Sequence, residues 1–185
     1  MKQLIYLAFM FVGIFCYAQN EWIEIADDYH GISFLSPLGA AKYDTLQTTF
    51  YAIKVDTSLS LHVHVFEDAK FGNGNEILTE ALQDSEGDTL RAIAKIMLLT
   101  TNSELTSIED IVTSYTSNLN INYVNGLEMS FYYKTLQSSQ QYHTFIRYYL
   151  LNNRFYAFSL TTGESEILRA YTYKNQFFNS IQFNF

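Results

Sequence analysis

The clearest pattern along the chain is a pair of β-rich runs, Thr49–Val55 and Leu59–Phe66, joined by Asp56–Ser58. In the second run, apolar residues alternate with serine and histidine, so that one face is apolar and the other polar. This period of two predicts a strand of which only one face is well buried. The three-residue loop predicts a hairpin in which residue 54 faces residue 60, 52 faces 62 and 50 faces 64.

Two later runs, Tyr142–Leu151 and Arg154–Thr161, are apolar at both odd and even positions. Asn152-Asn153 between them is typical of a tight hairpin turn, since asparagine tolerates the left-handed conformation that such turns require. Strands that are apolar on both faces lie inside a sheet and are covered from both sides. We therefore expect these two strands to be central.

Two further turn signals divide the remaining strand-like segments. The single proline, Pro37, ends a short strand expected within Gly31–Ser36. Asn125-Gly126 lies between Tyr123-Val124 and Leu127–Met129. Because this dipeptide is the strongest short-range hairpin signal, it predicts a type I′ turn at that point.

Apolar residues recur at helical spacing between residues 75 and 118 and again near the C-terminus. In the first region Asn75 and Asp88 are expected to cap two helices, and Thr106–Glu109 resembles a capping box before a third helix. The C-terminal helix is expected to be capped near Thr161/Thr162. The residues spaced for packing are Ile108, Ile111, Val112 and Tyr115 in the third helix and Ile167, Leu168, Tyr171 and Phe178 in the last.

Helices in the middle and at the end of the chain can cover the two faces of one largely antiparallel sheet. The pattern therefore predicts an α+β fold, an α/β/α sandwich with helices on both faces of the sheet. No repeat, low-complexity tract or linker divides residues 19–185, so we expect a single domain there.

Composition and charge exclude several classes of protein. The 185 residues are 48 % hydrophobic and 16 % charged, which excludes a disordered chain. The net charge of −8 disfavours binding to nucleic acid or to an anionic membrane surface, because both require a cationic face. We therefore expect no nucleic-acid partner.

The N-terminus indicates export. Lys2 precedes the apolar run Leu4–Phe15, and Cys16-Tyr17-Ala18 has small residues at positions −3 and −1 of a signal-peptidase site. We expect residues 1–18 to be a signal peptide, and a membrane anchor or lipid attachment at Cys16 is the alternative. Cleavage would leave a cysteine-free chain without a membrane span, in the periplasm or outside a bacterial cell.

Four segments together resemble the Mog1/PsbP-like superfamily: Ile32–Pro37, Tyr123–Glu128, Arg154–Phe158 and Phe177–Ile181. They lie in the order opening strand, hairpin, late strand and helix end, and they span nearly the whole mature domain. The resemblance implies a non-enzymatic scaffold that binds protein complexes or belongs to a bacterial envelope, with no shared catalytic motif. The helical region around residues 75–118 departs from the family pattern, so the family's partner sites cannot be placed on this chain.

His62-Val63-His64 is the sharpest candidate for metal chemistry. Two imidazoles two residues apart on a strand point to the same side and could share a metal ion. The predicted hairpin places Phe50 and Ala52 opposite them, and neither is a ligand. Since a stable site needs a third ligand, a solvated strand face is the expected alternative, and we expect no cofactor.

No motif of a common enzyme class occurs in the sequence. It has no Gly-x-Ser-x-Gly, His-Glu-x-x-His or Gly-x-x-x-x-Gly-Lys segment. Glycoside hydrolysis needs two carboxylates at a fixed separation across a cleft. Adjacent carboxylates such as Asp27-Asp28 do not establish that geometry and fit solvated loop charge. We therefore expect that the protein is not an enzyme.

Aromatic residues are abundant, with 15 tyrosines and 15 phenylalanines. Most of these rings are expected in the core and between strands. Tyrosine is also favoured at interfaces, because it buries area while its hydroxyl stays in water. The residues expected on such an interaction surface are Tyr132, Tyr148, Tyr149 and Tyr173.

These observations favour an exported, non-enzymatic envelope domain that binds or supports another protein or assembly. The alternative is a domain that binds a small ligand or a lipid in a pocket between sheet and helices. A hydrolase that uses scattered carboxylates or histidines is the third hypothesis.

Overall fold

The computed structural model describes residues 22–44, 48–67, 83–84, 86, 108–121, 123–135, 138–152 and 154–184. The predicted signal peptide and the two helices expected after Asn75 and Asp88 lie outside the described residues. The elements in chain order are β1 (Ile23–Asp27), β2 (Ile32–Ser36), β3 (Ala41–Asp44), β4 (Thr48–Lys54), β5 (Leu59–Glu67), β6 (Ile108–Ile121), β7 (Val124–Thr135), β8 (Ser138–Leu151), β9 (Arg154–Gly163), a 3-10 turn (Glu164–Glu166), α4 (Ile167–Asn179) and β10 (Gln182–Phe183).

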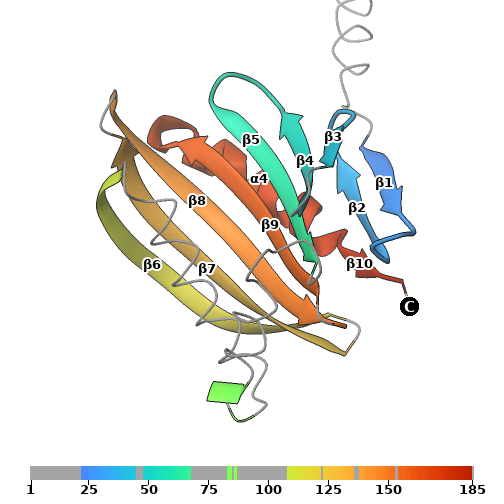
Figure 1. Cartoon of the computed structure of the whole chain (residues 1–185). Helices are drawn as coiled ribbons and strands as arrows, with labels where there is room; N and C mark the ends of the chain where they lie inside the picture. Colours follow the sequence, from blue (N-terminus) through green and yellow to red (C-terminus); the bar gives the residue numbers. More distant parts are fainter. Residues whose placement is uncertain are drawn as a thin grey trace, which may run out of the picture.

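A curved, antiparallel sheet of seven strands forms the body of the molecule, in the order β3-β4-β5-β9-β8-β7-β6 (Figure 1). The strands β8 and β9 lie inside this sheet, as their apolar faces predict. Their hairpin closes at Leu151 and Arg154, and Asn152 adopts a left-handed φ of 49°. The predicted hairpin between β8 and β9 is therefore confirmed.

The hairpin β4–β5 has the predicted register, with Phe50 opposite His64 and Ala52 opposite His62. Asp56 explains why the loop closes where it does. Its Oδ1 accepts hydrogen bonds from the Ser58 backbone N–H at 2.7 Å and from the Leu59 backbone N–H at 2.9 Å. A short acidic side chain that satisfies the backbone of the residues after it is a common turn device.

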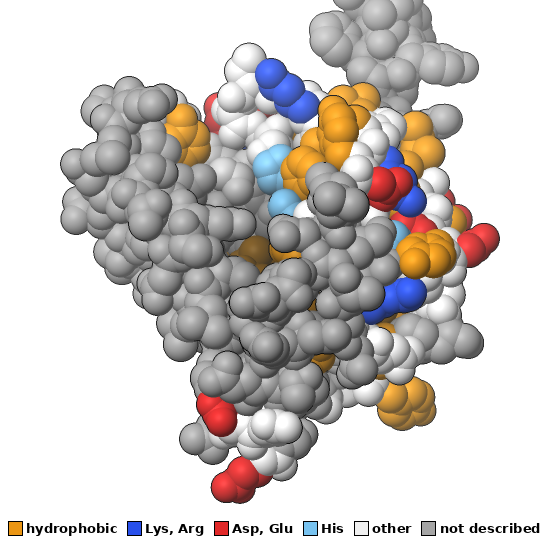
Figure 2. Space-filling view, in the orientation of Figure 1, with side chains coloured by type: hydrophobic (Ala, Val, Ile, Leu, Met, Phe, Trp, Pro, Cys, Tyr) orange, Lys and Arg blue, Asp and Glu red, His pale blue; other side chains and the backbone are white. Residues whose placement is uncertain are grey.

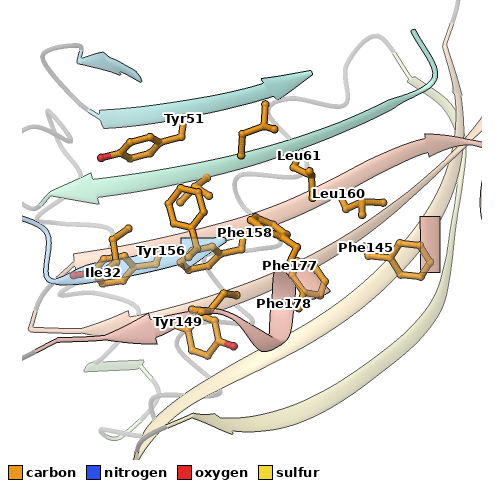
Figure 3. Close-up of a cluster of buried hydrophobic side chains, with 14 of the residues drawn as sticks. Ile32, Tyr51, Leu61, Phe145, Tyr149, Tyr156, Phe158, Leu160, Phe177 and Phe178 are labelled. Atoms are coloured by element: carbon orange, nitrogen blue, oxygen red, sulfur yellow. The ribbon is translucent and has the colours of Figure 1, made fainter. Parts of the chain in front are cut away.

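A small second sheet, in the order β1-β2-β10, and α4 both cover one face of the large sheet, here called the inner face (Figure 1). In Figure 3, buried side chains of the two sheets and of α4 point toward one another in the layer between them. Phe34 of β2 and Phe177 of α4 meet edge to face at 5.9 Å. The inner layer is thus closed by aromatic contacts between elements far apart in the sequence.

The opposite, outer face of the large sheet carries buried side chains as well. Tyr148 is 6 % exposed and Phe155 is 1 % exposed, and both point away from α4. Burial on both faces of the central strands is therefore confirmed. Among the described residues, however, α4 is the one helix that packs on the sheet, so helices on both faces are not supported.

The third predicted helix is wrong, because Ile108–Ile121 is the strand β6. Its pairing with β7 contains two register shifts, after Glu109 and after Thr113. Each shift leaves one extra residue in β6. These interruptions break the period of two, so the apolar residues of β6 recur at a spacing that resembles a helix.

The predicted turn at Asn125-Gly126 is also wrong. The strands β6 and β7 pair until Ile121 and Val124, so the turn lies three residues earlier, and Asn125 and Gly126 belong to β7. Gly126 is needed for another reason. A Cβ atom there would lie 2.5 Å from the Tyr149 ring and 2.6 Å from the Tyr148 carbonyl oxygen, so only glycine lets the neighbouring strand approach.

The C-terminal helix begins later than predicted and buries a different stripe. Thr161 and Thr162 still belong to β9, and no side chain caps α4. Leu168 is 83 % exposed, so the prediction that it packs is wrong. The buried residues of α4 are Ala170, Phe177 and Phe178, of which only Phe178 was expected.

We predict that Gly126→Ala destabilises the fold by about 1–3 kcal/mol, because the added methyl group must displace the buried Tyr149 ring and a backbone oxygen. Urea unfolding at neutral pH measures the change. Gly39→Ala is the matched control, since a Cβ at position 39 meets no atom within 4 Å. Equal stability of the two variants would contradict this role of Gly126.

Candidate functional site

Asp27, expected in a solvated loop, is instead buried at the end of β1. Its Oδ2 accepts hydrogen bonds from His30 Nδ1 at 2.6 Å, from Lys42 Nζ at 3.2 Å and from the Tyr51 hydroxyl group. The carboxylate thereby joins β1 of the small sheet to β3 and β4 of the large sheet. This is the closest approach to a catalytic constellation within the described residues.

The pKa values of Asp27 and Tyr51 do not suit acid–base chemistry near neutral pH. Burial alone would raise the pKa of Asp27, but the hydrogen bonds from Tyr51 and His30 outweigh it and hold this pKa well below its usual range. Burial and the bond to Asp27 raise the pKa of Tyr51 well above its usual range. A general acid or base works best with a pKa near the operating pH. The cluster therefore acts as a structural tie between the two sheets.

A second cluster of charges lies between α4 and the inner face of the sheet. Glu128 accepts a hydrogen bond from Arg147 Nε at 2.6 Å and contacts Lys174 Nζ at 2.5 Å, while Arg147 Nη1 donates to the Phe178 carbonyl oxygen at 2.9 Å. Burial opposes ionisation of Glu128, but the two cations lower its pKa. All three side chains are thus paired, and the cluster anchors the C-terminal half of α4.

His62 and His64 lie side by side on β5, on the outer face. Their ring centroids are 6.5 Å apart, and the Phe50 ring lies 5.4 Å from His62 and 4.4 Å from His64. No group of three or more His, Cys, Asp or Glu side chains that could hold a metal ion is found within the residues that the structure describes. The expected solvated face is wrong in one respect, because both histidines are half-buried.

Burial changes the charge of these two histidines. It lowers the pKa of His62, and together with the neighbouring His62 it lowers the pKa of His64 to about 4. Both rings are therefore neutral at physiological pH. Together with the rings of Tyr43, Phe50 and Phe66, the two imidazoles form an uncharged surface on β3–β5.

These rings continue a row across the outer face, in which each ring contacts the next. The successive centroid distances are 6.1 Å for Tyr43–Phe50, 4.4 Å for Phe50–His64, 5.8 Å for His64–Phe66, 5.9 Å for Phe66–Phe155 and 5.2 Å for Phe155–Tyr148. The row begins at an exposed ring, Tyr43 at 55 %, and ends at buried ones. We call its accessible part, Tyr43, Phe50, His62, His64 and Phe66, the aromatic–histidine patch.

Figure 2 shows histidine atoms next to hydrophobic side chains on the side of the molecule that carries this patch. Of this patch, His62 and His64 were candidate site residues from the sequence, whereas Tyr43, Phe50 and Phe66 were not. A signal was present, since Phe50 and His64 were already placed opposite each other by the hairpin register. The contribution of Tyr43 depends on β3, a four-residue strand with no pattern of its own.

The four tyrosines expected on an interaction surface divide into two pairs. Tyr148 is 6 % exposed and Tyr149 is fully buried, so the prediction is wrong for these two. Tyr132 and Tyr173 are half-buried, and a role for them in binding stays a prediction. Tyr132 stacks on His143 with a centroid distance of 3.9 Å, and Tyr173 contacts Trp22 at 5.7 Å.

A shallow groove of about 520 Å³ lies on the outside of α4, next to β2. It lies on the surface of α4, so it differs in place from the pocket between sheet and helices that the alternative hypothesis of a ligand- or lipid-binding domain requires. The lining residues are Leu35, Thr172, Asn175, Gln176, Asn179 and Ser180.

None of the described helices is long and apolar enough to cross a membrane.

His143 is a buried histidine of β8, opposite Thr162 of β9. It is 2 % exposed, and neither ring nitrogen has a hydrogen-bond partner within the described part of the chain. Burial, with the nearby Lys174, lowers its pKa to about 4. The ring is held by stacking on Tyr132 and by Phe145, whose centroid is 4.2 Å away.

We predict that His143→Phe stabilises the protein and flattens its pH dependence. In the unfolded chain, His143 binds a proton below its ordinary pKa of 6.5, whereas in the folded protein it stays neutral down to about pH 4. Because the unfolded state alone gains this proton, His143 lowers the free energy of unfolding by about 2 kcal/mol as the pH drops from 7 to 5. Urea unfolding at both pH values measures the difference. Tyr132→Phe keeps the stack and the histidine, so it should retain the wild-type slope, and an unchanged slope in His143→Phe would contradict the argument.

Comparison with known proteins places this geometry in a known fold. No family model matches the sequence, and no curated protein matches it. The solution structure of PsbP (CyanoP) from Synechocystis sp. PCC 6803 is similar with a TM-score of 0.58 and 10 % identity, covering 90 % of this chain and 95 % of that one. The crystal structure of the Ran-binding protein Mog1p from Saccharomyces cerevisiae gives a TM-score of 0.51 at 9 % identity, covering 89 % and 96 %. The chain therefore has a Mog1/PsbP-like fold, as the order of its motifs predicted.

Proposed function

We propose that this protein is an exported, non-enzymatic domain that binds another protein through the aromatic–histidine patch on β3–β5. The observation that carries the proposal is the continuous row of rings that becomes accessible toward β3, with Tyr43 55 % exposed. Packing of the core does not explain an accessible, uncharged aromatic surface on a sheet. Protein interfaces are enriched in such rings at their centres.

The contacts within the patch prepare it for binding. Phe50 touches Tyr43, His62 and His64, so its ring is already fixed before a partner arrives. Binding then immobilises few side chains, which keeps the entropic cost of association low. The chain's net charge of −8 favours a partner with a basic surface, because opposite charge accelerates encounter.

Two further observations support a binding role over catalysis. The buried carboxylates of Asp27 and Glu128 are engaged by hydrogen bonds and ion pairs, and their pKa values are lowered, away from neutrality. The Ran-binding protein Mog1p has the same fold, which supports the view that this scaffold can present a protein-binding surface. Export follows from the signal-peptide pattern of residues 1–18, as part of the proposal.

A photo-crosslinking residue in place of Tyr43 tests the proposal in the cell that produces the protein. We expect one defined adduct between position 43 and a different protein, because this side chain lies at the accessible end of the patch. Position 171 on α4 is the matched control, since Tyr171 is also exposed, at 44 %, but lies on the other side of the sheet. The same adduct from both positions, or none from position 43, would count against the patch.

Substitution within the patch should weaken binding of the partner that is captured. Phe50→Ser removes the ring that contacts Tyr43 and both histidines, and loss of such a central ring costs roughly tenfold to a hundredfold in affinity. Tyr171→Ser serves as the control that leaves the patch intact. Titration calorimetry measures the affinity, and circular dichroism verifies that both variants are folded.

A further inference from the structure

The strand β3 is the last strand on one side of the large sheet, and it pairs only with β4 among the described strands. All four of its residues, Ala41–Asp44, are exposed. The outer side of such a strand offers backbone N–H and C=O groups to another strand. Its short length and its lysine are devices that proteins use against unspecific pairing, so any partner must match its side chains closely.

A second copy of this chain can pair with β3 only in a few registers. Two antiparallel strands related by a two-fold axis have their axis perpendicular to the sheet, and directly opposite residues lie on the same face. The axis must therefore pass midway between a residue and the same residue of the second copy, which face each other. Within β3 the possible centres are Ala41, Lys42, Tyr43 and Asp44.

The four registers differ in which residues they place opposite Lys42 and Asp44, the two charged residues of β3. A centre at Lys42 places two lysines opposite each other, and a centre at Asp44 places two carboxylates opposite each other, and both arrangements are destabilising. A centre at Ala41 places Lys42 opposite the uncharged Ala40. A centre at Tyr43 places Lys42 of each copy opposite Asp44 of the other, which gives two opposite-charge pairs.

The same register brings the two ring rows together. Tyr43 lies on the outer face, where it pairs with Phe50, and a centre at Tyr43 sets the two exposed Tyr43 rings opposite each other. Opposite side chains in antiparallel strands have Cβ atoms about 5 Å apart, a distance at which aromatic pairs stabilise the sheet. The rows of both copies would then form one continuous surface.

We propose that β3 pairs with β3 of a second copy in an antiparallel register centred on Tyr43, joining two seven-stranded sheets into one. Lys42 keeps its bond to Asp27 in this arrangement, because an ammonium group has three donors and its side chain is 42 % exposed. Asp44 accepts a hydrogen bond from Thr49 Oγ1 at 2.7 Å, and a carboxylate has further acceptor positions. The inference does not depend on the proposed partner protein, although the two patches would lie on the same side of the dimer.

Sedimentation of the purified full chain over about three decades of concentration tests the pairing. The four-residue strand belongs to the lower end of interface sizes, so we expect a reversible equilibrium between monomer and dimer. Asp44→Lys should weaken dimerisation by at least about tenfold, because it replaces both opposite-charge pairs by lysine pairs. Asp28→Lys is the control with the same change of charge at an exposed residue outside β3. A wild-type monomer at every concentration, or equal weakening by the control, would overturn the proposal.

Disulfide trapping tests the register itself. Tyr43→Cys places a thiol opposite its own copy, whereas Ala41→Cys places it about four residues, roughly 14 Å, from its copy along the paired strand. Under mild oxidation we expect covalent dimers at least about tenfold faster from position 43 than from position 41. Both variants also carry Cys16→Ser, so that the introduced cysteine is the one thiol of the chain, and the Cys16→Ser chain gives the background. Equal rates would contradict the register, and because no partner protein is present, that outcome would leave the proposed function unaffected.

Discussion

The arrangement of the whole molecule depends on one buried ring, Phe158 of β9. Its centroid lies 6.2 Å from Phe34, 6.0 Å from Tyr149, 6.3 Å from Phe177 and 6.5 Å from Phe183. These rings come from β2, β8, α4 and β10, so one side chain fixes the helix and the small sheet to the large sheet. Aromatic pairs contribute about 0.5–1.5 kcal/mol each beyond the area that they bury. The inner face of the large sheet is therefore buried in the core.

The burial of Phe158 on the inner face determines which side chains of β9 lie on the outer face. Because side chains alternate along a strand, the neighbours of Phe158 on β9 point outward, and they are Ala157 opposite His64 and Ser159 opposite His62. Both neighbours are small, so the imidazoles lie beside short side chains on β9 and beside Phe50 on β4. The two histidines are half-buried and neutral within the aromatic row because their neighbours on β9 are small and their neighbour on β4 is an aromatic ring.

The features that could be predicted from the sequence are those fixed by local chemistry. The β4–β5 register follows from Asp56 and its turn, and the opening strand ends at Pro37 as expected. The features that could not be predicted depend on distant contacts. Gly126 resembles a turn residue, but it is required by the Tyr149 ring of a neighbouring strand, and the burial of Asp27 depends on donors from β3, β4 and the following turn. For the site, the histidines were identifiable, whereas the row of rings was not, because it crosses five strands.

The edge of the large sheet is tied to the small sheet by charge. Asp27 is ionised because Tyr51 and His30 donate to it, and Lys42 on β3 is held by that carboxylate. Lys42 is therefore positioned before any partner arrives, and Asp44 is positioned by Thr49 in the same way. A short strand with preset charges of opposite sign loses little entropy on pairing, and it rejects strands whose charges do not alternate in the same order. Selectivity at this edge thus comes from residues of this chain, while the scaffold that presents them is the part it shares with the other proteins of its fold.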